Sequence, residues 1–394
     1  MTVRIEEITT PRQLDTFIQF PFSIYKGNPY WVPPLLMDEK NTLDWNKNPA
    51  FEDAQARYWL AYKNGKLSGR IAAILNNKAN KKWHQLKLRF GWVDFIDDRE
   101  VSGALFETVE NWAKELGMLA VHGPLGFTDL DPEGMLVEGF DELCTLALIY
   151  NHPYYPEHLV AMGYEKEVDW LEYEIQVPNP PHPKLAKAAE IVLKRSRVEV
   201  VIFKNKKELL KRANEIFDLL DTEYSILFGT VPLSERQKQA YIDQYLSFVA
   251  LDLLPVLVNE NNEMVGFAIV MPSLSRALQK SQGKLFPTGW IHLLKALKTN
   301  TLGDLYLIAV RSDYHGQGLN AVIMHHVNIA LNRHGITKVK TNANLESNSD
   351  VQGQWKLFEK RQHKRRRCFI KHLEPAQEID PDLTTDSLEE ATSS

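Results

Sequence analysis

Two glycines separated by a single residue stand where a strand-like run passes into a helix-like run. Residues 307–320 read LIAVRSDYHGQGLN, with Gly316 and Gly318 just before the predicted helix. Glycine lets a backbone approach an anion closely, and the free N–H groups in the first turn of a helix point toward such a ligand. The turn therefore suits a phosphate group, but a tight connection between a strand and a helix uses the same residues. The motif alone leaves both interpretations open.

A second candidate for chemistry is an acidic, glycine-rich segment in the first half of the chain. Residues 122–142 read HGPLGFTDLDPEGMLVEGFDE and are too long and too rich in glycine for a plain connection. The segment suits recognition of a cationic substrate or capping of a sheet, and the sequence favours neither. Its acid spacing is not that of an EF-hand, so calcium is not expected. The six acids are Asp129, Asp131, Glu133, Glu138, Asp141 and Glu142.

The bulk composition is that of a soluble globular protein with more than one domain. The 394 residues exceed what one hydrophobic core usually serves, and 44% of them are hydrophobic. No apolar run reaches the length of a membrane span, and the N-terminus lacks the pattern of a signal peptide. We therefore expect a cytoplasmic protein without a membrane partner. Cys144 and Cys368 have no ligand-spaced neighbours, so neither a disulfide framework nor a metal site is expected.

The charge is distributed unevenly along the chain. The formal net charge is −5, but residues 374–394 hold seven acids and no base, which leaves +2 on residues 1–373. A tail with so little to bury is expected to be disordered. Residues 356–371 before it are strongly basic, with three consecutive arginines at 365–367. A nucleic-acid patch is one interpretation of this run, but a solvated strand face partly neutralised by the tail is favoured.

The elements that must position these residues occur twice in the same order. Residues 59–75 and 254–272 each predict a β-hairpin, the first with an Asn-Gly turn. A strand and a helix follow in each half, with the helices at 99–116 and about 319–334. Each half then closes with a strand that ends in asparagine, a short helix and a last strand. The chain is therefore predicted to be an internal duplication with an α/β fold, in which helices flank mixed, mainly antiparallel sheets.

This plan resembles the GNAT superfamily of acyl-CoA N-acyltransferases. The resemblance rests on a hairpin with a glycine early in its second strand, a strand ending in Gly-x-Gly before a helix, and a strand ending in asparagine before a short helix. It covers residues 1–373 as two tandem copies, and GRIAAI, HGPLGF and EGMLVEGFDE are similar to bacterial tandem GNAT-like proteins of unknown substrate. It implies GNAT-like domains at 1–178 and 179–373, joined by the proline-rich connector 177–184, and a disordered acidic tail at 374–394.

The resemblance also implies a site for acetyl-CoA or another acyl-CoA in the second half only. The superfamily holds the CoA pyrophosphate with a Gln/Arg-x-x-Gly-x-Gly/Ala loop, and Gly318 matches the central glycine. His315 replaces the usual Arg or Gln, and Asn320 replaces the final small residue. In the first half Asp97 and Asp98 stand at the helix N-terminus, where they would repel a pyrophosphate. The implied cofactor-binding residues, with two strand positions for the pantetheine arm, are Ile308, Val310, His315, Gly316, Gln317, Gly318, Leu319 and Asn320.

Acyl transfer to an amine requires a base for the amine and a proton donor for the departing thiolate. The resemblance implies a carboxylate for the first role and, for the second, a tyrosine on the helix after the closing asparagine. Trp355 occupies that tyrosine position, so a standard proton donor is missing. The candidate catalytic residues are Glu346, Asn348 and Tyr306, with Tyr314 and Asp304 as alternatives. An N-cap role for the Glu346 and Asn348 pair, and a packing role for the tyrosines, fit equally well.

Three functions are compatible with these residues. The favoured hypothesis is an acyl-CoA-dependent N-acyltransferase, with acetyl transfer as the first expectation, acting on a small-molecule amine or peptide. The alternatives are a non-catalytic protein that keeps the GNAT fold for ligand binding, and a Fem-like aminoacyl transferase, which the basic residues 356–367 would favour. Nucleic acid is not an expected partner. The sequence does not predict the acceptor, the acyl group or the oligomeric state, because a fold alone does not define a function.

Overall fold

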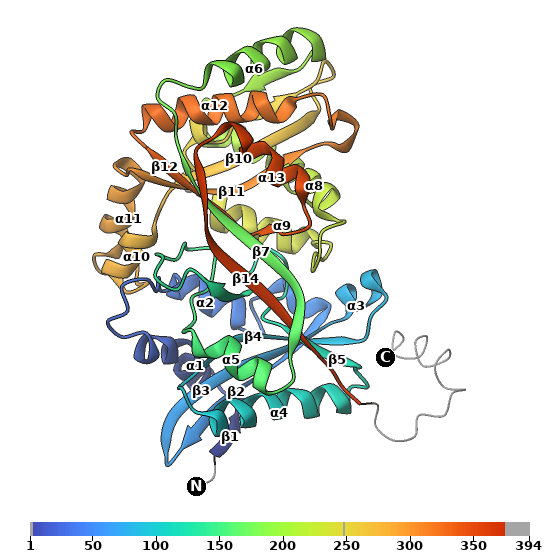
Figure 1. The fold of residues 1–394 in the computed structure, drawn as a ribbon, viewed down its shortest axis with the longest axis vertical. Coiled ribbons are helices and arrows are strands. Elements are labelled where there is room, and N and C mark those ends of the chain that lie inside the picture. Colours follow the sequence, from blue (N-terminus) through green and yellow to red (C-terminus); the bar gives the residue numbers. More distant parts are fainter. Residues whose placement is uncertain (1–2, 247–248, 375–394) are drawn as a thin grey trace.

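The computed structural model describes residues 3–246 and 249–374 (Figure 1). All but the first residue of the predicted acidic tail lies outside these ranges. The elements of the first half are β1 (Val3–Glu7), α1 (Pro11–Ile24), α2 (Leu36–Leu43), β2 (Ala54–Lys63), β3 (Lys66–Asn76), α3 (Asn77–Trp83), β4 (Lys87–Phe95), α4 (Arg99–Glu115), β5 (Ala120–Gly123), β6 (Met135–Glu138), α5 (Tyr154–Ala161) and β7 (Glu165–Gln176). The elements of the second half are α6 (Pro183–Ser196), β8 (Glu199–Val201), α7 (Lys206–Lys211), α8 (Ala213–Tyr224), α9 (Glu235–Tyr241), β9 (Val256–Val258), β10 (Met264–Pro272), α10 (Ser275–Ser281), α11 (Gly289–Lys298), β11 (Leu302–Val310), α12 (Leu319–Arg333), β12 (Lys338–Thr341), β13 (Asn344–Leu345), α13 (Ser349–Gln354) and β14 (Lys360–His372).

The described strands join in one sheet that runs through both halves. The strand order is β1-β2-β3-β4-β5-β14-β7-β12-β11-β10-β9-β8, with β6 beside β14 and β13 beside β7. Neighbouring strands are antiparallel except for one parallel pair in each half, β4 with β5 and β11 with β12. The repeated hairpins and helices and the last strands β7 and β14 are therefore confirmed, as is the mixed sheet flanked by helices. The predicted strand that ends in Asn151 is wrong: residues 146–151 form a turn and irregular chain between β6 and α5.

The last strand of each half is exchanged between the halves. β14, from the end of the chain, pairs with β5 of the first half, and β7, from the first half, pairs with β12 of the second. β7 and β14 also pair with each other from Glu165 to Ile175, and the two long strands run together through the centre of Figure 1. Each half therefore relies on a strand of the other to continue its sheet, and the domain boundaries at 1–178 and 179–373 stay a prediction.

The two halves also share a hydrophobic core on one face of the sheet. Helices α6 and α12 cover the opposite face of the second half, where they pack on each other. A single buried cluster combines side chains from both halves, so their contact is more than the β7–β14 ladder. Its members include Tyr25, Trp31, Leu148 and Tyr150 of the first half and Phe217, Leu220, Phe267 and Leu278 of the second.

The basic run near the C-terminus lies in the central strand β14, and its charges are paired inside the protein. Arg366 is fully buried and its Nε donates to Glu172 on β7 at 2.5 Å. Arg365 and Arg367 both bind Asp169. The prediction of a strand is thus confirmed, but the solvated face partly neutralised by the tail is wrong, because acids of β7 neutralise the run. This pairing also removes the main reason for a Fem-like or nucleic-acid function.

The pair between Glu172 and Arg366 yields a test of stability. Burial opposes ionisation of Glu172, but the charges of Arg366 and Lys364 prevail and lower its pKa to about 2. Glu172→Gln would leave two buried cations without a counter-charge, which should cost about 3–5 kcal/mol of unfolding free energy. Because the folded pKa lies below the ordinary 4.5, the wild-type protein should lose this stabilisation as the pH falls from about 4.5 toward 2. Urea unfolding across that pH range measures both effects.

The matched control is Glu174→Gln, two residues further along β7. Glu174 pairs with Arg361 and Lys338, whose side chains are about half exposed. This change should cost at most about 1 kcal/mol, because exposed ion pairs contribute little. Equal losses in the two variants would contradict a special role for the buried pair.

Candidate functional site

The predicted phosphate turn is present at the end of β11. A short 3-10 helix at Ser312–Tyr314 follows the strand, and Gly316 and Gly318 adopt left-handed backbone angles, with φ of 73° and 86°. α12 then begins at Leu319, as predicted. Within the described part of the chain, the backbone N–H groups of residues 316 and 318–320 donate to no protein acceptor. This is the arrangement that an anion requires at a helix N-terminus.

The turn packs closely against α6. A Cβ added at Gly318 would lie only 2.9 Å from Val192 Cγ2, so a side chain there requires both backbone strain and a shift of α6. Arg195 of the same helix reaches the carbonyl of Gln317 at 3.5 Å, which places a permanent cation beside the turn. His315, at the position where the superfamily uses Arg or Gln, turns back and contacts the Val310 carbonyl through Nε2 at 2.7 Å.

β11 carries an irregularity directly before this turn. Residue 306 is an extra residue opposite β10, because Val270 pairs with Leu305 while Ile269 pairs with Leu307. β11 and β12 separate at the same level: their parallel register ends at Leu305 and Thr341, after which the chain continues to β13 beside β7. The edge of β11 from residue 306 onward is therefore not paired with another strand.

Side chains occupy the carbonyls on this freed edge. The Tyr224 hydroxyl of α8 donates to the Ile308 carbonyl at 3.1 Å, and Asn342 donates to the Tyr306 carbonyl at 3.4 Å. With His315 on the Val310 carbonyl, all three backbone acceptors have a side-chain partner. A ligand that pairs with the strand would have to displace these partners.

The three predicted catalytic residues are not brought together around this edge. Glu346 is 41% exposed and forms ion pairs with Lys166 and Arg365, whose hydrogen bonds lower its pKa. Asn348 caps α13 and accepts from the Val351 N–H at 3.2 Å. Tyr306 lies at the irregularity of β11 and is partly buried; its buried hydroxyl has no hydrogen-bond partner within the described ranges, and burial raises its pKa.

The structure also shows what surrounds Trp355, Tyr314 and Asp304, to which the sequence draws attention. Trp355, at the usual tyrosine position, is completely buried in the core beneath α12. Tyr314 packs beside that core, with the Arg311 guanidinium over its ring at 5.2 Å. Asp304 is buried at the start of β11, and burial raises its pKa to about 6 against the opposing effects of Ser273 and Lys340.

The acidic segment 122–142 lies between the halves and faces the second half. Asp129 lines a small hollow together with Tyr224, Asp221 and Thr230. Burial raises the pKa of Asp129, of Asp131 to about 6, and of Glu133 well above the ordinary value. All three side chains are nevertheless partly accessible. Asp129 and Tyr224 line this hollow, which holds only about 10 Å³, and the charge of Asp129 helps to raise the pKa of Asp131 and of Glu133; we call the site formed by Asp129, Asp131, Glu133 and Tyr224 the acidic crevice.

Two residues of the first half, Arg89 and Trp83, form hydrogen bonds with the chain after α8 beside the acidic crevice. Arg89 on β4 is buried and donates to the carbonyls of Gly126 and Gly229 at 2.9 and 2.8 Å, which ties the acidic segment to the chain after α8. Trp83 donates to the Thr230 carbonyl at 3.0 Å. The contacts of Arg89 with Gly229 and of Trp83 with Thr230 join residues 140 and 147 positions apart. Neither Arg89 nor Tyr224 carries a sequence signal beyond its residue type.

The equivalent helix start in the first half is closed. Asp98 caps α4 and accepts from the backbone N–H groups of Glu100 and Val101. His158, the equivalent of Trp355, contacts Ser102 at 2.8 Å and Asp97 at 3.0 Å. The groups that could hold an anion are thus occupied by carboxylates in this half, whereas they are open at Gly316 and Gly318.

One cluster of potential metal ligands occurs away from the acidic crevice. His122, Glu167 and Cys368 place one ligand atom each within 4.8 Å of one another. Lys87 binds Glu167 at 2.5 Å, and burial raises the pKa of the Cys368 thiol well above its ordinary value. An ammonium group and a protonated thiol both oppose a cation, so the cluster fits a buried hydrogen-bonded glutamate better than a metal centre.

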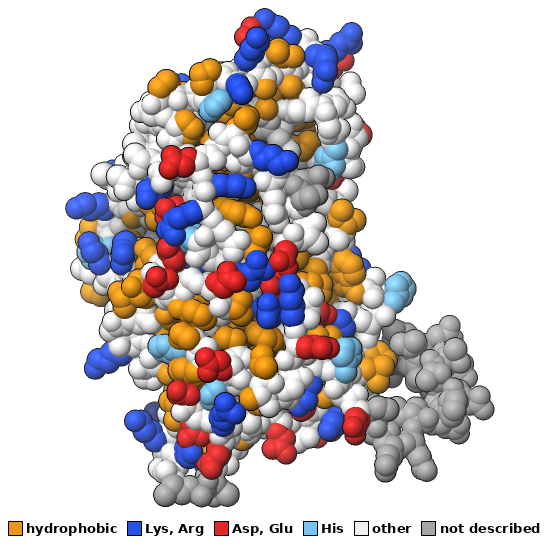
Figure 2. Space-filling model, viewed as in Figure 1, with side chains coloured by type: hydrophobic (Ala, Val, Ile, Leu, Met, Phe, Trp, Pro, Cys, Tyr) orange, Lys and Arg blue, Asp and Glu red, His pale blue; other side chains and the backbone are white. Residues whose placement is uncertain are grey.

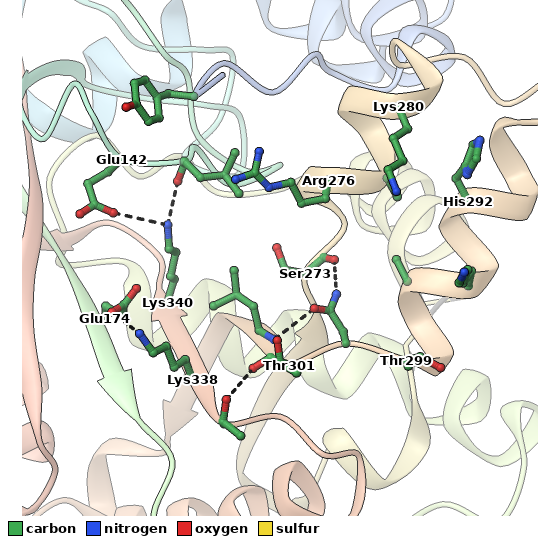
Figure 3. Close-up of a pocket in the computed structure, with 18 of the residues that line it drawn as sticks. Glu142, Glu174, Ser273, Arg276, Lys280, His292, Thr299, Thr301, Lys338 and Lys340 are labelled. Atoms are coloured by element: carbon green, nitrogen blue, oxygen red, sulfur yellow. Dashed lines mark hydrogen bonds and ion pairs between the residues drawn. The ribbon is translucent and has the colours of Figure 1, made fainter. Parts of the chain in front are cut away.

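A larger hollow, of about 670 Å³, lies at the other end of β11 (Figure 3). Thr301 and Leu302 at the start of the strand line it, so it is distinct from the glycine turn that follows Val310. One wall carries Lys338 and Lys340, which form ion pairs with Glu174 and Glu142. The wall from α10 and α11 carries Arg276, Lys280 and Lys295, which form no ion pair with an acid of the described residues.

The sequence relatives cover most of the chain at low identity. No protein-family model matches it. It is 27% identical over 367 residues to the protein YghO of Escherichia coli strain K12, covering 91% of this chain and 93% of that one. It is 25% identical over 294 residues to the bacterial ceramide synthase of Caulobacter vibrioides, covering 74% and 75% of the two chains.

Solved structures share the architecture of both halves. A tandem GNAT protein from the clavulanic acid biosynthesis pathway matches with a TM-score of 0.54 at 12% identity, covering 95% of this chain and 100% of that one. A GCN5-related N-acetyltransferase from Sphaerobacter thermophilus matches at 0.51 and 11%, covering 96% and 98%. The chain has a tandem GNAT-like fold, as the resemblance implied.

Proposed function

We propose that this protein is an acyl-CoA-dependent N-acyltransferase whose donor site is in the second half and whose amine site is the acidic crevice. One observation carries the proposal: the freed edge of β11, with its open glycine turn, meets the acids of segment 122–142 through Tyr224. The fold supports acyl transfer in general. The placement of donor and acceptor is an inference from the local chemistry.

The donor would use the features that the second half alone retains. Within the described residues, the N–H groups of Gly316 and of residues 318–320 have no protein acceptor and suit a pyrophosphate, with Arg195 as a neighbouring cation. The pantetheine arm of acyl-CoA is an amide chain and can pair with the β11 carbonyls now bound by Tyr224 and Asn342. The proposed cofactor-binding residues therefore remain Ile308, Val310 and the turn from His315 to Asn320.

The acceptor would be an amine drawn to the acidic crevice. Carboxylates attract an ammonium group, and a buried carboxylate with a raised pKa is a better base near neutral pH than an exposed one. Asp129 would take a proton from the ammonium group, the free amine would attack the thioester carbonyl, and the carbon–sulfur bond would break. Tyr224, with its pKa raised by burial to about 12, stays protonated and can donate a hydrogen bond to the departing sulfur. The attacking nitrogen then loses its second proton and the thiolate takes up a proton, which leaves an amide and free CoA.

The similarity to a bacterial ceramide synthase extends this proposal to the size of the substrates. Ceramide is an amide of a long-chain amino alcohol, so the name ceramide synthase refers to formation of an amide bond, which is also the product of the reaction proposed here. We therefore include long-chain acyl-CoA and long-chain amines beside acetyl-CoA in the tests. A non-catalytic binding function is the second candidate, because Trp355 is buried and His315 is engaged with the backbone.

The donor site is tested by thermal unfolding with millimolar CoA. Ligand that binds only the folded state should raise the Tm of the wild-type protein by about 2–4 °C. Gly318→Val should abolish this shift, because a side chain there closes the turn against α6. Gly335→Val is the matched control: Gly335 has φ of 71° near the other end of α12, with open space around its Cβ position. It should lower the Tm itself but keep the shift. An unchanged wild-type Tm counts against the donor site.

The acceptor site is tested by release of free thiol from acetyl-CoA or palmitoyl-CoA with a panel of amines. Asp129→Asn should lower the rate by about a hundredfold or more if Asp129 is the base. Burial raises the Asp129 pKa. The wild-type rate should therefore increase with pH as Asp129 ionises, and this increase should occur at a higher pH than for an ordinary aspartate.

Glu346→Gln is the comparison, since Glu346 is the base candidate from sequence. The paired, exposed geometry of Glu346 predicts a change below about twofold. A large loss in this variant with none in Asp129→Asn would move the base to Glu346. Stabilisation by CoA without thiol release from any pair of substrates would favour the non-catalytic alternative.

A further inference from the structure

The outer face of α11 and the loop before it expose a group of large apolar side chains. Phe286 is 77% exposed, and Trp290, Ile291 and Leu294 are between 45% and 49% exposed. All four fall within nine residues, whereas the other exposed large apolar residues of the described chain are scattered singly. A concentration of exposed apolar surface on one element marks an interaction site more often than chance.

This exposure is not a sign of a loose segment. Leu293, Ala296 and Leu297 on the inner face of α11 pack against the core shared by both halves. The preceding loop is closed by backbone bonds from Trp290 N–H to the Leu285 carbonyl and from Leu36 N–H to the Gly283 carbonyl. The helix is therefore held firmly, with its apolar outer face turned to solvent.

The charged side chains of the segment that carries this face are all basic. Residues 264–303 contain no acid, and they contain five bases, Arg276, Lys280, Lys284, Lys295 and Lys298. Within residues 3–246 and 249–374, none of the five forms an ion pair with an acidic side chain. By contrast, the basic run of β14 is neutralised inside the protein. Basic side chains gather at the left edge of the molecule in Figure 2, where Figure 1 places α11.

The hollow of about 670 Å³ lies beside this segment, and its charged lining combines five bases, Arg276, Lys280, Lys295, Lys338 and Lys340, with three acids, Asp141, Glu142 and Glu174. Arg276, Lys280, His292 and Lys295 line it from α10 and α11, and Figure 3 shows Lys280 and His292 on this wall. The hollow thus opens beside the exposed face, and its unpaired cations suit an anionic head group next to an apolar phase.

We propose that α11 and the loop before it form a docking surface for a membrane that contains anionic lipids. The outer arc of the helix combines Trp290, Ile291 and Leu294 with Lys295 and Lys298 at its edge. Lysines can extend from an apolar face to the phosphates while aromatic and aliphatic side chains enter the head-group region. α11 has ten residues and lies along the surface; none of the described helices is long and apolar enough to cross a bilayer.

This docking does not depend on the proposed acyl transfer, so it is tested without acyl-CoA. The full-length protein is floated with vesicles of phosphatidylcholine alone and of equimolar phosphatidylcholine and phosphatidylglycerol. The wild-type protein should float with the anionic vesicles, weakly or not at all with the neutral ones, and less as salt is added. Trp290→Ser with Ile291→Ser should lower the partition coefficient by at least about tenfold. Lys295→Glu with Lys298→Glu should do the same.

The control variants lie on α6, which has an exposed basic face with one large apolar side chain. Ile191 is 52% exposed on that helix, which also carries Lys184 and Lys187. Ile191→Ser, and Lys184→Glu with Lys187→Glu, should leave flotation unchanged, and all variants should keep the wild-type Tm. No flotation of the wild-type protein, equal flotation of the α11 variants, or an equal loss in the α6 variants would overturn the proposal. Self-association that the α11 changes abolish would also overturn it, because a second copy would then occupy the surface.

Discussion

The pairing of β7 with β14 is the constraint on which the rest of the structure depends. Each strand continues the sheet of the half to which it does not belong, and a buried pair of Glu172 with Arg366 lies in their ladder. Neither half can leave the other without opening its own sheet. Loss of strand pairing and exposure of a buried charge pair would coincide, so we expect the two halves to unfold together.

This fixed relation between the halves creates the acidic crevice. Asp129 comes from a segment of the first half, and Tyr224 comes from a helix of the second, yet both line one hollow. Arg89 secures the arrangement through carbonyls on both walls. The helix starts of the two halves accordingly differ: Asp98 closes the one in the first half, while Gly316 and Gly318 leave the one in the second half open. A duplicated fold can thus place donor groups in one copy and acceptor groups in the other.

Local features of this fold were predictable from sequence, whereas contacts between distant residues were not. Glycine turns, hairpins and helix periodicity depend on neighbours within a few positions, and these elements occur where the sequence predicts them. The predicted strand before Asn151 does not form, and the Asn151 side chain instead pairs with the backbone of Leu136 on β6. The exchange of β7 and β14 leaves no local signal, because either strand fits either position in an antiparallel sheet. For the same reason the sequence predicts a solvated strand face at Arg366, because its partner Glu172 lies 194 positions away along the chain. The sequence singles out Asn348 as the closing asparagine and Glu346 as a carboxylate beside it. The ion pairs of Glu346 and the capping hydrogen bond of Asn348 depend on the folded structure and leave no sequence signal.

The expectation of no membrane partner rested on the length of apolar runs, which addresses only spanning segments. Docking through α11 depends instead on which face of a short helix is left uncovered, and the sequence GWIHLLKALK does not define that face. The position of α11 also limits what docking could do. α11 and α8 lie on opposite sides of the second half in Figure 1, and α8 contributes Tyr224 to the acidic crevice. A bilayer held by α11 would therefore not directly face that wall of the crevice. Docking would then raise the local concentration of the protein at the membrane, while a long-chain amine would still have to leave the bilayer to reach Asp129.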